Sequence, residues 1–311
     1  MLDITIRTEY GERYVRPSAR ELDALVRRIG GAGDGLLVLQ RVPDLPAVFA
    51  QVLRTPEGHY QLEHRAGAPE LHFDTRLDDP APVARALIAW ARATTPDAEA
   101  EAWDAGISWR NMGFPPDPAV PDLPEDVRLQ LEELVHGLLR GGYHDRLTLT
   151  ERARDYLVDG DERPVSFAQA ERLVDRLWRE RVAEMAEWGE DLTDPERLTA
   201  AFAALDDAGI ITRENYTCCR TCGIGEIGGE DGAEEARGYV FFHEQCTEGA
   251  AAGGALFLLY GGFDESGETT AAVGREVTEA LRGQGLTVAW DGDPESAIQV
   301  TGLDWRKRLI G

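Results

Sequence analysis

The chain has 311 residues, a length typical of about two domains, and its 43% hydrophobic residues suffice for a core in each, which excludes a chain disordered throughout. Its 57 acidic and 32 basic residues give a net charge of −25. The electrostatic field of so negative a chain repels phosphate groups, so nucleic acids and anionic membranes are excluded as expected partners. The same charge favours a basic protein partner.

Residues 1–113 are expected to form an α+β domain in which two helices cover an antiparallel sheet. Alternating polar and apolar residues predict the strands. Ser18 and Glu21 form a capping box at the start of the first helix, and Pro80 and Pro82 stand near the start of the second. In chain order the expected elements are strand 2–7, helix 19–29, strands 35–40, 47–54, 59–65 and 69–75, and helix 82–93.

Residues 114–125 contain five prolines and no apolar periodicity, which predicts a semi-rigid linker. Residues 126–311 then predict a helical segment that leads into a smaller, mixed α/β C-terminal domain. The expected helices are 125–140, 148–158, 166–188, 194–208 and 269–283, and the expected strands are 238–244, 255–261 and 286–290. The last helix lies between the last two strands, a spacing that fits a crossover connection.

A cytoplasmic location is expected from the start of the chain and from its hydropathy. The opening residues, MLDITIRTEYGERY, lack the apolar stretch of a signal peptide, and no apolar run reaches the ~18 residues of a membrane span. Cysteines in that reducing compartment are thiols or metal ligands rather than disulfides.

The most informative stretch for chemistry holds three of the four cysteines. Cys219 and Cys222 have the C-x-x-C spacing of a zinc knuckle, with a glycine after the second thiol that would permit a tight turn. Twenty residues later, His243 and Cys246 supply a second pair, so the four residues predict a zinc site. Cys218, Glu244 and Glu248 are additional candidate ligands.

Two other interpretations of these residues stay open. The cysteines can be small buried apolar residues, or Cys219 and Cys222 can carry out thiol redox chemistry. Redox C-x-x-C motifs lie between a strand and the start of a helix, whereas glycines follow here and no helix is expected, which disfavours redox chemistry. The acidic residues around His243, which include Glu226 and Glu230, are best interpreted as a solvated strand end in so acidic a chain.

The C-terminal half resembles a bacterial domain family of unknown function. The resemblance lies in the segments TCCRTCGIGEIGGE from Thr217, GYVFFHEQCTE from Gly238 and LFLLYG from Leu256, with the TCCxTCG and GYVFFHxQ motifs most distinctive. It implies an acidic residue where Cys246 stands, and therefore a site of Cys218 or Cys219 with Cys222, His243 and a carboxylate.

Residues 1–113 resemble the small immunity proteins of bacterial polymorphic toxin systems, through ARELDALVRRIGG from Ala19, the strand series and ISW from Ile107. Since no catalytic motif is evident, the first hypothesis is a non-enzymatic binding or regulatory protein, toxin-neutralising if the resemblance holds. The alternatives are an enzyme with a Cys/His/Glu site, metal-assisted or not, and a scaffold with structural zinc.

The site hypotheses require that the thiol-rich turn and the strand ending at His243 lie against each other. The sequence indicates neither a substrate nor an oligomeric state.

Overall fold

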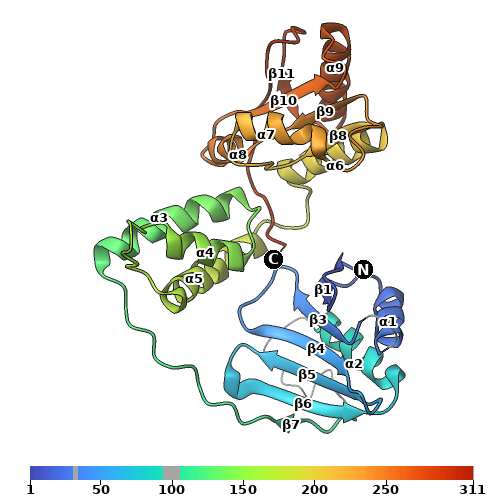
Figure 1. Ribbon diagram of the computed structural model, residues 1–311, viewed down its shortest axis with the longest axis vertical. Coiled ribbons are helices and arrows are strands. Elements are labelled where there is room, and N and C mark those ends of the chain that lie inside the picture. The colour runs from blue at the N-terminus through green and yellow to red at the C-terminus, as the bar shows by residue number, and fades with distance from the viewer. Residues whose placement is uncertain (31–33, 94–105, 311) are drawn as a thin grey trace. The chain divides into compact units, whose positions relative to one another are not determined.

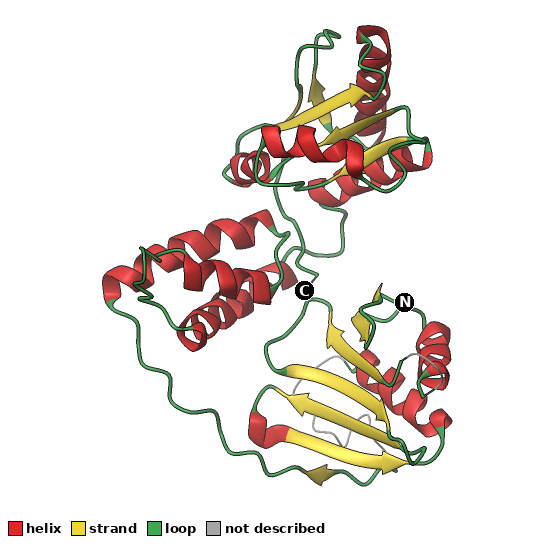
Figure 2. Cartoon of the chain, in the orientation of Figure 1, coloured by secondary structure: helices red, strands yellow, loops and turns green. Residues whose placement is uncertain are grey.

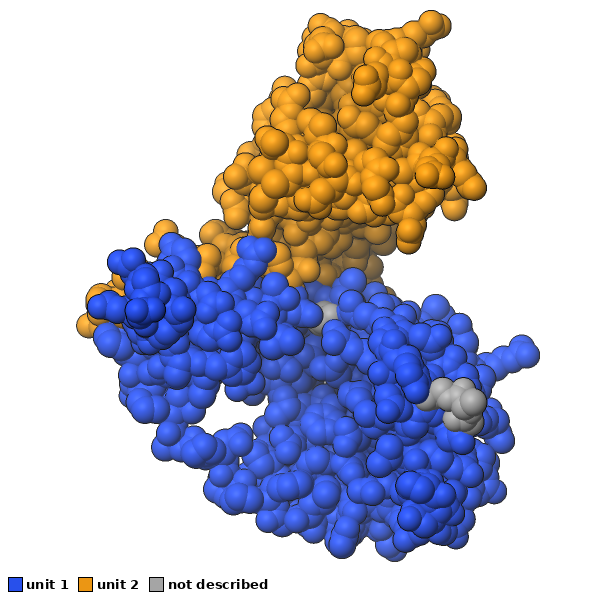
Figure 3. Space-filling model, in the orientation of Figure 1, with its two compact units in different colours: residues 1–124, 145–182, 309–311 blue, residues 125–144, 183–308 orange. Residues whose placement is uncertain are grey.

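The computed structural model describes residues 1–30, 34–93 and 106–310. Contacts divide the chain into two compact units, one formed by residues 1–124, 145–182 and 309–311 and the other by residues 125–144 and 183–308 (Figure 3). No helix within the described ranges is long and apolar enough to cross a membrane.

The first unit contains the predicted antiparallel sheet, and the two helices predicted beside it are confirmed (Figures 1 and 2). The strands described there follow the order β2-β1-β3-β4-β5-β6-β7, with the short β2 and β7 at the two edges; no residue range was predicted for either. The elements are β1 (Ile4–Thr8), β2 (Arg13–Val15), α1 (Ala19–Arg28), β3 (Leu36–Arg41), β4 (Val48–Arg54), β5 (Tyr60–Ala66), η1 (Pro69–Leu71), β6 (His72–Leu77), α2 (Pro80–Arg92) and β7 (Arg110–Asn111).

The core of this sheet forms where alternating strand residues meet α1 and α2. Ile4 and Ile6 of β1 are fully buried against Leu22 of α1 and against Leu87 and Trp90 of α2. The alternation that predicted the strands therefore also decides which face of the sheet packs against the helices.

Helices α4 (Arg146–Asp155) and α5 (Phe167–Ala186) are attached to the loop that follows β3. The guanidinium of Arg146 contacts the carboxylates of Asp44 and Asp175, each at 2.7 Å, and Trp178 donates its indole N–H to the carbonyl of Asp44 at 2.6 Å. Asp44 is 5% exposed, so its carboxylate depends on Arg146 for compensation.

The proline-rich residues 114–124 contain no helix or strand, and α5 holds their end. Arg172 donates to the carbonyl of Val120 at 2.8 Å, and Gln169 donates to that of Pro121 at 3.2 Å. The predicted division into residues 1–113, 114–125 and 126–311 stays a prediction.

The second unit contains the predicted mixed sheet, in the order β11-β12-β10-β9-β8. Only β8 and β9 pair in parallel, and the other neighbours are antiparallel. The elements are α3 (Glu125–Gly141), α6 (Asp194–Asp207), β8 (Ile210–Arg213), α7 (Arg220–Glu226), η3 (Ile227–Gly229), β9 (Gly238–Phe241), α8 (Glu244–Ala251), β10 (Leu256–Gly262), α9 (Gly267–Gly283), β11 (Thr287–Ala289) and β12 (Ile298–Thr301).

The crossover through α9 joins strands that run in the same direction but are not neighbours. Strand β12 lies between β10 and β11 and is antiparallel to both. The sequence interpretation lacked β12, as it lacked β8, α7 and α8, and it continued β9 to residue 244 although the strand ends at Phe241.

Helices lie on both faces of the mixed sheet (Figure 1). Val240 and Phe242 point into a core shared with α6 and α9, whereas Phe241 points to the opposite face, where it packs with Ile211 and Ile227. Helix α7 lies on this second face, so the alternation of β9 sets the position of the cysteine motif.

Candidate functional site

The loop between β8 and α7 is held in a strained backbone conformation beside the end of β9. Asn215 and Thr217 have φ angles of +50° and +57°, a region that a β-branched threonine rarely adopts. The amide of Tyr216 donates to the carbonyl of Phe242 at 2.8 Å, and the amide of Glu244 donates to that of Thr217 at 3.1 Å. The thiol-rich turn and the aromatic strand end therefore lie against each other, as the hypotheses for the site required.

Hydrogen bonds to the Glu230 carboxylate connect this loop to the segment after α7. Tyr216 donates its hydroxyl to Oε1 of Glu230 at 2.7 Å, and Arg213 donates to Oε2 at 2.8 Å. These hydrogen bonds, from Tyr216 first and Arg213 second, lower the pKa of Glu230. Desolvation, with a contribution from Glu230, raises the pKa of Tyr216 to about 12. Glu230 is thus an anchor of the loop rather than an available carboxylate.

Helix α7 sits close to the sheet because Gly223 has no side chain. A Cβ atom at Gly223 would lie 2.4 Å from the ring of Phe241, so the glycine permits helix–sheet contact rather than the tight turn expected from the sequence. The expectation that no helix follows the cysteines was wrong, because contacts with Phe241 stabilise a helix that its glycines disfavour. Cys219 consequently lies between a strand and the start of a helix, and Cys222 lies in the first turn of that helix.

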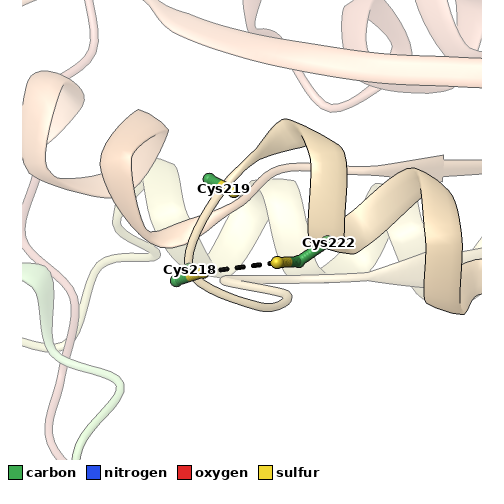
Figure 4. A group of neighbouring side chains, drawn as sticks. All are labelled: Cys218, Cys219 and Cys222. Carbon is green, nitrogen blue, oxygen red and sulfur yellow. Dashed lines mark hydrogen bonds between the residues drawn. The ribbon is translucent and has the colours of Figure 1, made fainter.

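Three thiols meet at this helix start (Figure 4). Cys218 precedes the helix, Cys219 is its N-cap residue and Cys222 lies in its first turn. The Sγ atoms of all three lie within 4.8 Å of one another, and those of Cys218 and Cys222 are 3.7 Å apart. Cys218 is exposed and the other two are partly exposed, so reagents can reach the cluster.

The surroundings shift the pKa values of two of these thiols in opposite directions. Amide and thiol donors of Cys222, then the thiol of Cys218, lower the pKa of Cys219. The neighbouring thiols of Cys218 and Cys219 raise the pKa of Cys222 to about 11. Cys219 is therefore the thiol most readily ionised of this pair, and thiolates rather than thiols attack disulfides.

His243 and Cys246 form a separate pair at the start of α8. His243 is the N-cap residue and is 9% exposed, and its Nε2 lies 3.3 Å from Sγ of Cys246. Burial lowers the pKa of His243 and raises that of Cys246, so both shifts favour a neutral imidazole beside a neutral thiol. The first turn of α8 bends the backbone between these two residues and brings their side chains together.

The acidic residues after His243 lie on a helix, so their interpretation as a solvated strand end was wrong. The helix was missed because the continuous apolar run of residues 239–242 was interpreted as a buried strand that extends to residue 244. Glu244 is mostly buried and contacts Nε2 of His144 at 3.0 Å, while Glu248 is exposed. His144 was not among the predicted site residues, since it precedes Glu244 by 100 positions and no motif marks it.

The structure therefore groups the predicted ligands into two sets. Within the described residues, the group of three or more donor atoms that lie within 4.8 Å of one another and could share an ion consists of the thiols of Cys218, Cys219 and Cys222, without His243 or Cys246. The zinc site predicted from Cys219, Cys222, His243 and Cys246 stays a prediction.

These features describe a mixed α/β domain with a cluster of accessible thiols at a helix start. Residues 124–309, more than half of the chain, match the model of a family described as a domain of unknown function (DUF6891), and the chain belongs to that family. This confirms a C-terminal domain of unknown function. No curated protein and no solved structure matches the chain. The resemblance of residues 1–113 to immunity proteins stays a prediction.

Proposed function

We propose that the C-terminal unit carries out thiol–disulfide exchange, with Cys219 as the attacking thiolate and Cys222 as the resolving thiol. The observation that carries the proposal is the position of the motif: Cys219 is the N-cap residue of α7, after a strand and a loop, and Cys222 lies in the first turn of the helix. Redox C-x-x-C motifs occupy this position because backbone amides at a helix start stabilise the first thiolate.

The exchange would proceed in two steps that conserve electrons. The thiolate of Cys219 attacks one sulfur of a substrate disulfide, that disulfide breaks, and its other sulfur leaves and takes up a proton. Cys222 then loses its proton and attacks Sγ of Cys219, which releases the second substrate thiol. The substrate gains two electrons, the protein retains a Cys219–Cys222 disulfide, and an external dithiol reduces it again.

The raised pKa of Cys222 suits the resolving role. The neighbouring thiols of Cys218 and Cys219 raise the pKa of Cys222 and so hold its proton while Cys219 is free. Once Cys219 is bound in a mixed disulfide, its contribution to this effect is gone, so Cys222 ionises more readily. The second step therefore becomes favourable only after the first.

The test uses the full, reduced chain with glutathione disulfide as the probe. We expect the wild-type chain to form an internal disulfide, Cys219→Ser to react at least about tenfold more slowly, and Cys222→Ser to accumulate a mixed disulfide with glutathione on Cys219. Peptide mass spectrometry identifies the modified residue. Equal rates for wild type and Cys219→Ser would overturn the proposal.

Cys246→Ser is the matched control, because it removes a thiol from the same unit that pairs with His243 instead of joining the cluster. Its rate is expected to equal that of the wild type.

The hypothesis of a basic protein partner rests on the net charge of −25 and stays a prediction beside this proposal.

A further inference from the structure

We infer that Cys218, Cys219 and Cys222 also form a binding site for Cu⁺, with the three sulfur atoms as its ligands. This site uses Cys218, which the exchange reaction does not need, and it excludes His243 and Cys246, which the sequence favoured as ligands. The inference goes beyond thiol–disulfide exchange and does not depend on it.

The spacing of the sulfur atoms is close to that of a metal–thiolate site. A metal–sulfur bond of about 2.3 Å in a trigonal arrangement separates the sulfur atoms by about 4.0 Å. The Sγ atoms of Cys218 and Cys222 are 3.7 Å apart, and all three lie within 4.8 Å of one another. Shifts of less than about 1 Å, within reach of χ1 adjustments, would therefore seat one ion.

The backbone brings adjacent cysteines to the same point and holds them there. Cys219 is extended, with φ −154° and ψ 171°, and the helix that starts after it returns Cys222 to the cluster one turn later. Cys218 follows Thr217, whose carbonyl accepts from the amide of Glu244. A site formed before the ion arrives avoids part of the ordering cost of binding.

The number of donors favours Cu⁺ over Zn²⁺. Structural zinc sites have four protein ligands, whereas the donor group found among the described residues offers three. His243 and Cys246 are not part of this group, and they lie in contact with each other. Thiolates are soft ligands that select Cu⁺, a d¹⁰ ion for which three thiolates complete the coordination. The exposure of Cys218 gives the ion a route into the site.

A bound ion and thiol–disulfide exchange exclude each other. The electron pair that Cys219 would use to attack a disulfide is the pair that it donates to the metal. Cu⁺ would therefore keep the cluster reduced and unreactive for as long as it stays bound.

The experiment titrates Cu⁺ into the full, reduced chain without oxygen, in competition with the chromophoric chelator bicinchoninate. We expect one ion per chain, and we expect Cys218→Ser and Cys222→Ser each to lower the affinity by at least about tenfold through loss of a ligand. Cys246→Ser is expected to bind as tightly as the wild type. Circular dichroism of each variant separates loss of a ligand from loss of folding.

Three results would overturn the inference: a wild-type chain that does not compete with bicinchoninate, a folded Cys218→Ser variant with wild-type affinity, or a Cys246→Ser variant that loses as much affinity as Cys218→Ser. The third would favour the four-donor set predicted from the sequence. None of them bears on the exchange reaction, which is measured with glutathione disulfide in metal-free buffer.

Discussion

Helices α7 and α8 each begin just after a strand and a short loop, and each carries a cysteine in its first turn, yet their surroundings differ. Cys222 and the N-cap residue Cys219 are partly exposed beside a third thiol. Cys246 faces an imidazole that is 9% exposed. The first environment lowers the pKa of one thiol, whereas the second raises the pKa of its thiol through burial. Hydrogen-bond donors at one helix start and burial at the other therefore shift the pKa values of the two thiols in opposite directions, so a position at a helix start does not by itself make a cysteine reactive.

The largest expected effect is a difference in alkylation rate between these two helix starts. At pH 7 and in the reduced chain, Cys219 is expected to react with iodoacetamide at least about tenfold faster than Cys246, because its surroundings favour the thiolate while burial keeps Cys246 protonated. As pH rises, the thiolate forms and alkylation accelerates, so the midpoint for Cys219 is expected below that of an ordinary cysteine, because its pKa is lowered, and the midpoint for Cys246 above it, because its pKa is raised. Peptide mass spectrometry measures both rates in one sample.

The control for this contrast is the chain unfolded in urea, where both cysteines lose their surroundings and the difference in rates should vanish. Equal rates in the folded chain would mean that the two environments do not control the thiols, and would remove the main physical support for Cys219 as the attacking residue.

The next largest effect tests whether the contact with Phe241 positions α7. Gly223→Ala puts a Cβ atom 2.4 Å from the Phe241 ring, and Phe241 is fully buried, so the helix or the ring must move. Such overpacking is expected to lower the free energy of unfolding by about 1–3 kcal/mol and to slow alkylation of Cys219. Chemical denaturation followed by circular dichroism measures the stability.

Gly225→Ala is the matched control in the same helix. A Cβ atom at Gly225 meets nothing within 4 Å, and alanine is the better helix former, so stability is expected to stay equal or rise by up to about 1 kcal/mol. A Gly223→Ala variant as stable as Gly225→Ala would contradict the close approach of α7 to the sheet.

The sequence could predict elements whose signals are local, and it missed those that tertiary contacts impose. The capping box of Ser18 and Glu21 starts α1 as expected, and the Pro80 region starts α2. By contrast, the glycines of α7 carry a weak helix propensity, and the helix packs against Phe241 at Gly223, where a Cβ atom would not fit. Residue spacing alone cannot show such a contact across the fold.

The same limit applies to the candidate site. The C-x-x-C spacing identified Cys219 and Cys222, and it also kept Cys218 as an additional ligand. His243 and Cys246 were expected as a pair of ligands, but the helix that places them together was not, because the sequence extended β9 through a position where α8 begins. A strand would have directed the two side chains differently, whereas the first turn of a helix brings them to 3.3 Å.

The smallest expected effect concerns the hydroxyl of Tyr216, which ties the cysteine loop to Glu230. Tyr216→Phe removes the 2.7 Å hydrogen bond but leaves Glu230 its contact with Arg213, so the expected loss of stability is about 0.5–1.5 kcal/mol. Denaturation measures this loss, with Tyr156→Phe as a control because Tyr156 is 53% exposed and its change should stay within about 0.5 kcal/mol. If the loop holds the thiols in place, Tyr216→Phe also weakens Cu⁺ binding while Tyr156→Phe does not. Unchanged metal affinity in a destabilised Tyr216→Phe variant would show that α7 alone positions the cluster.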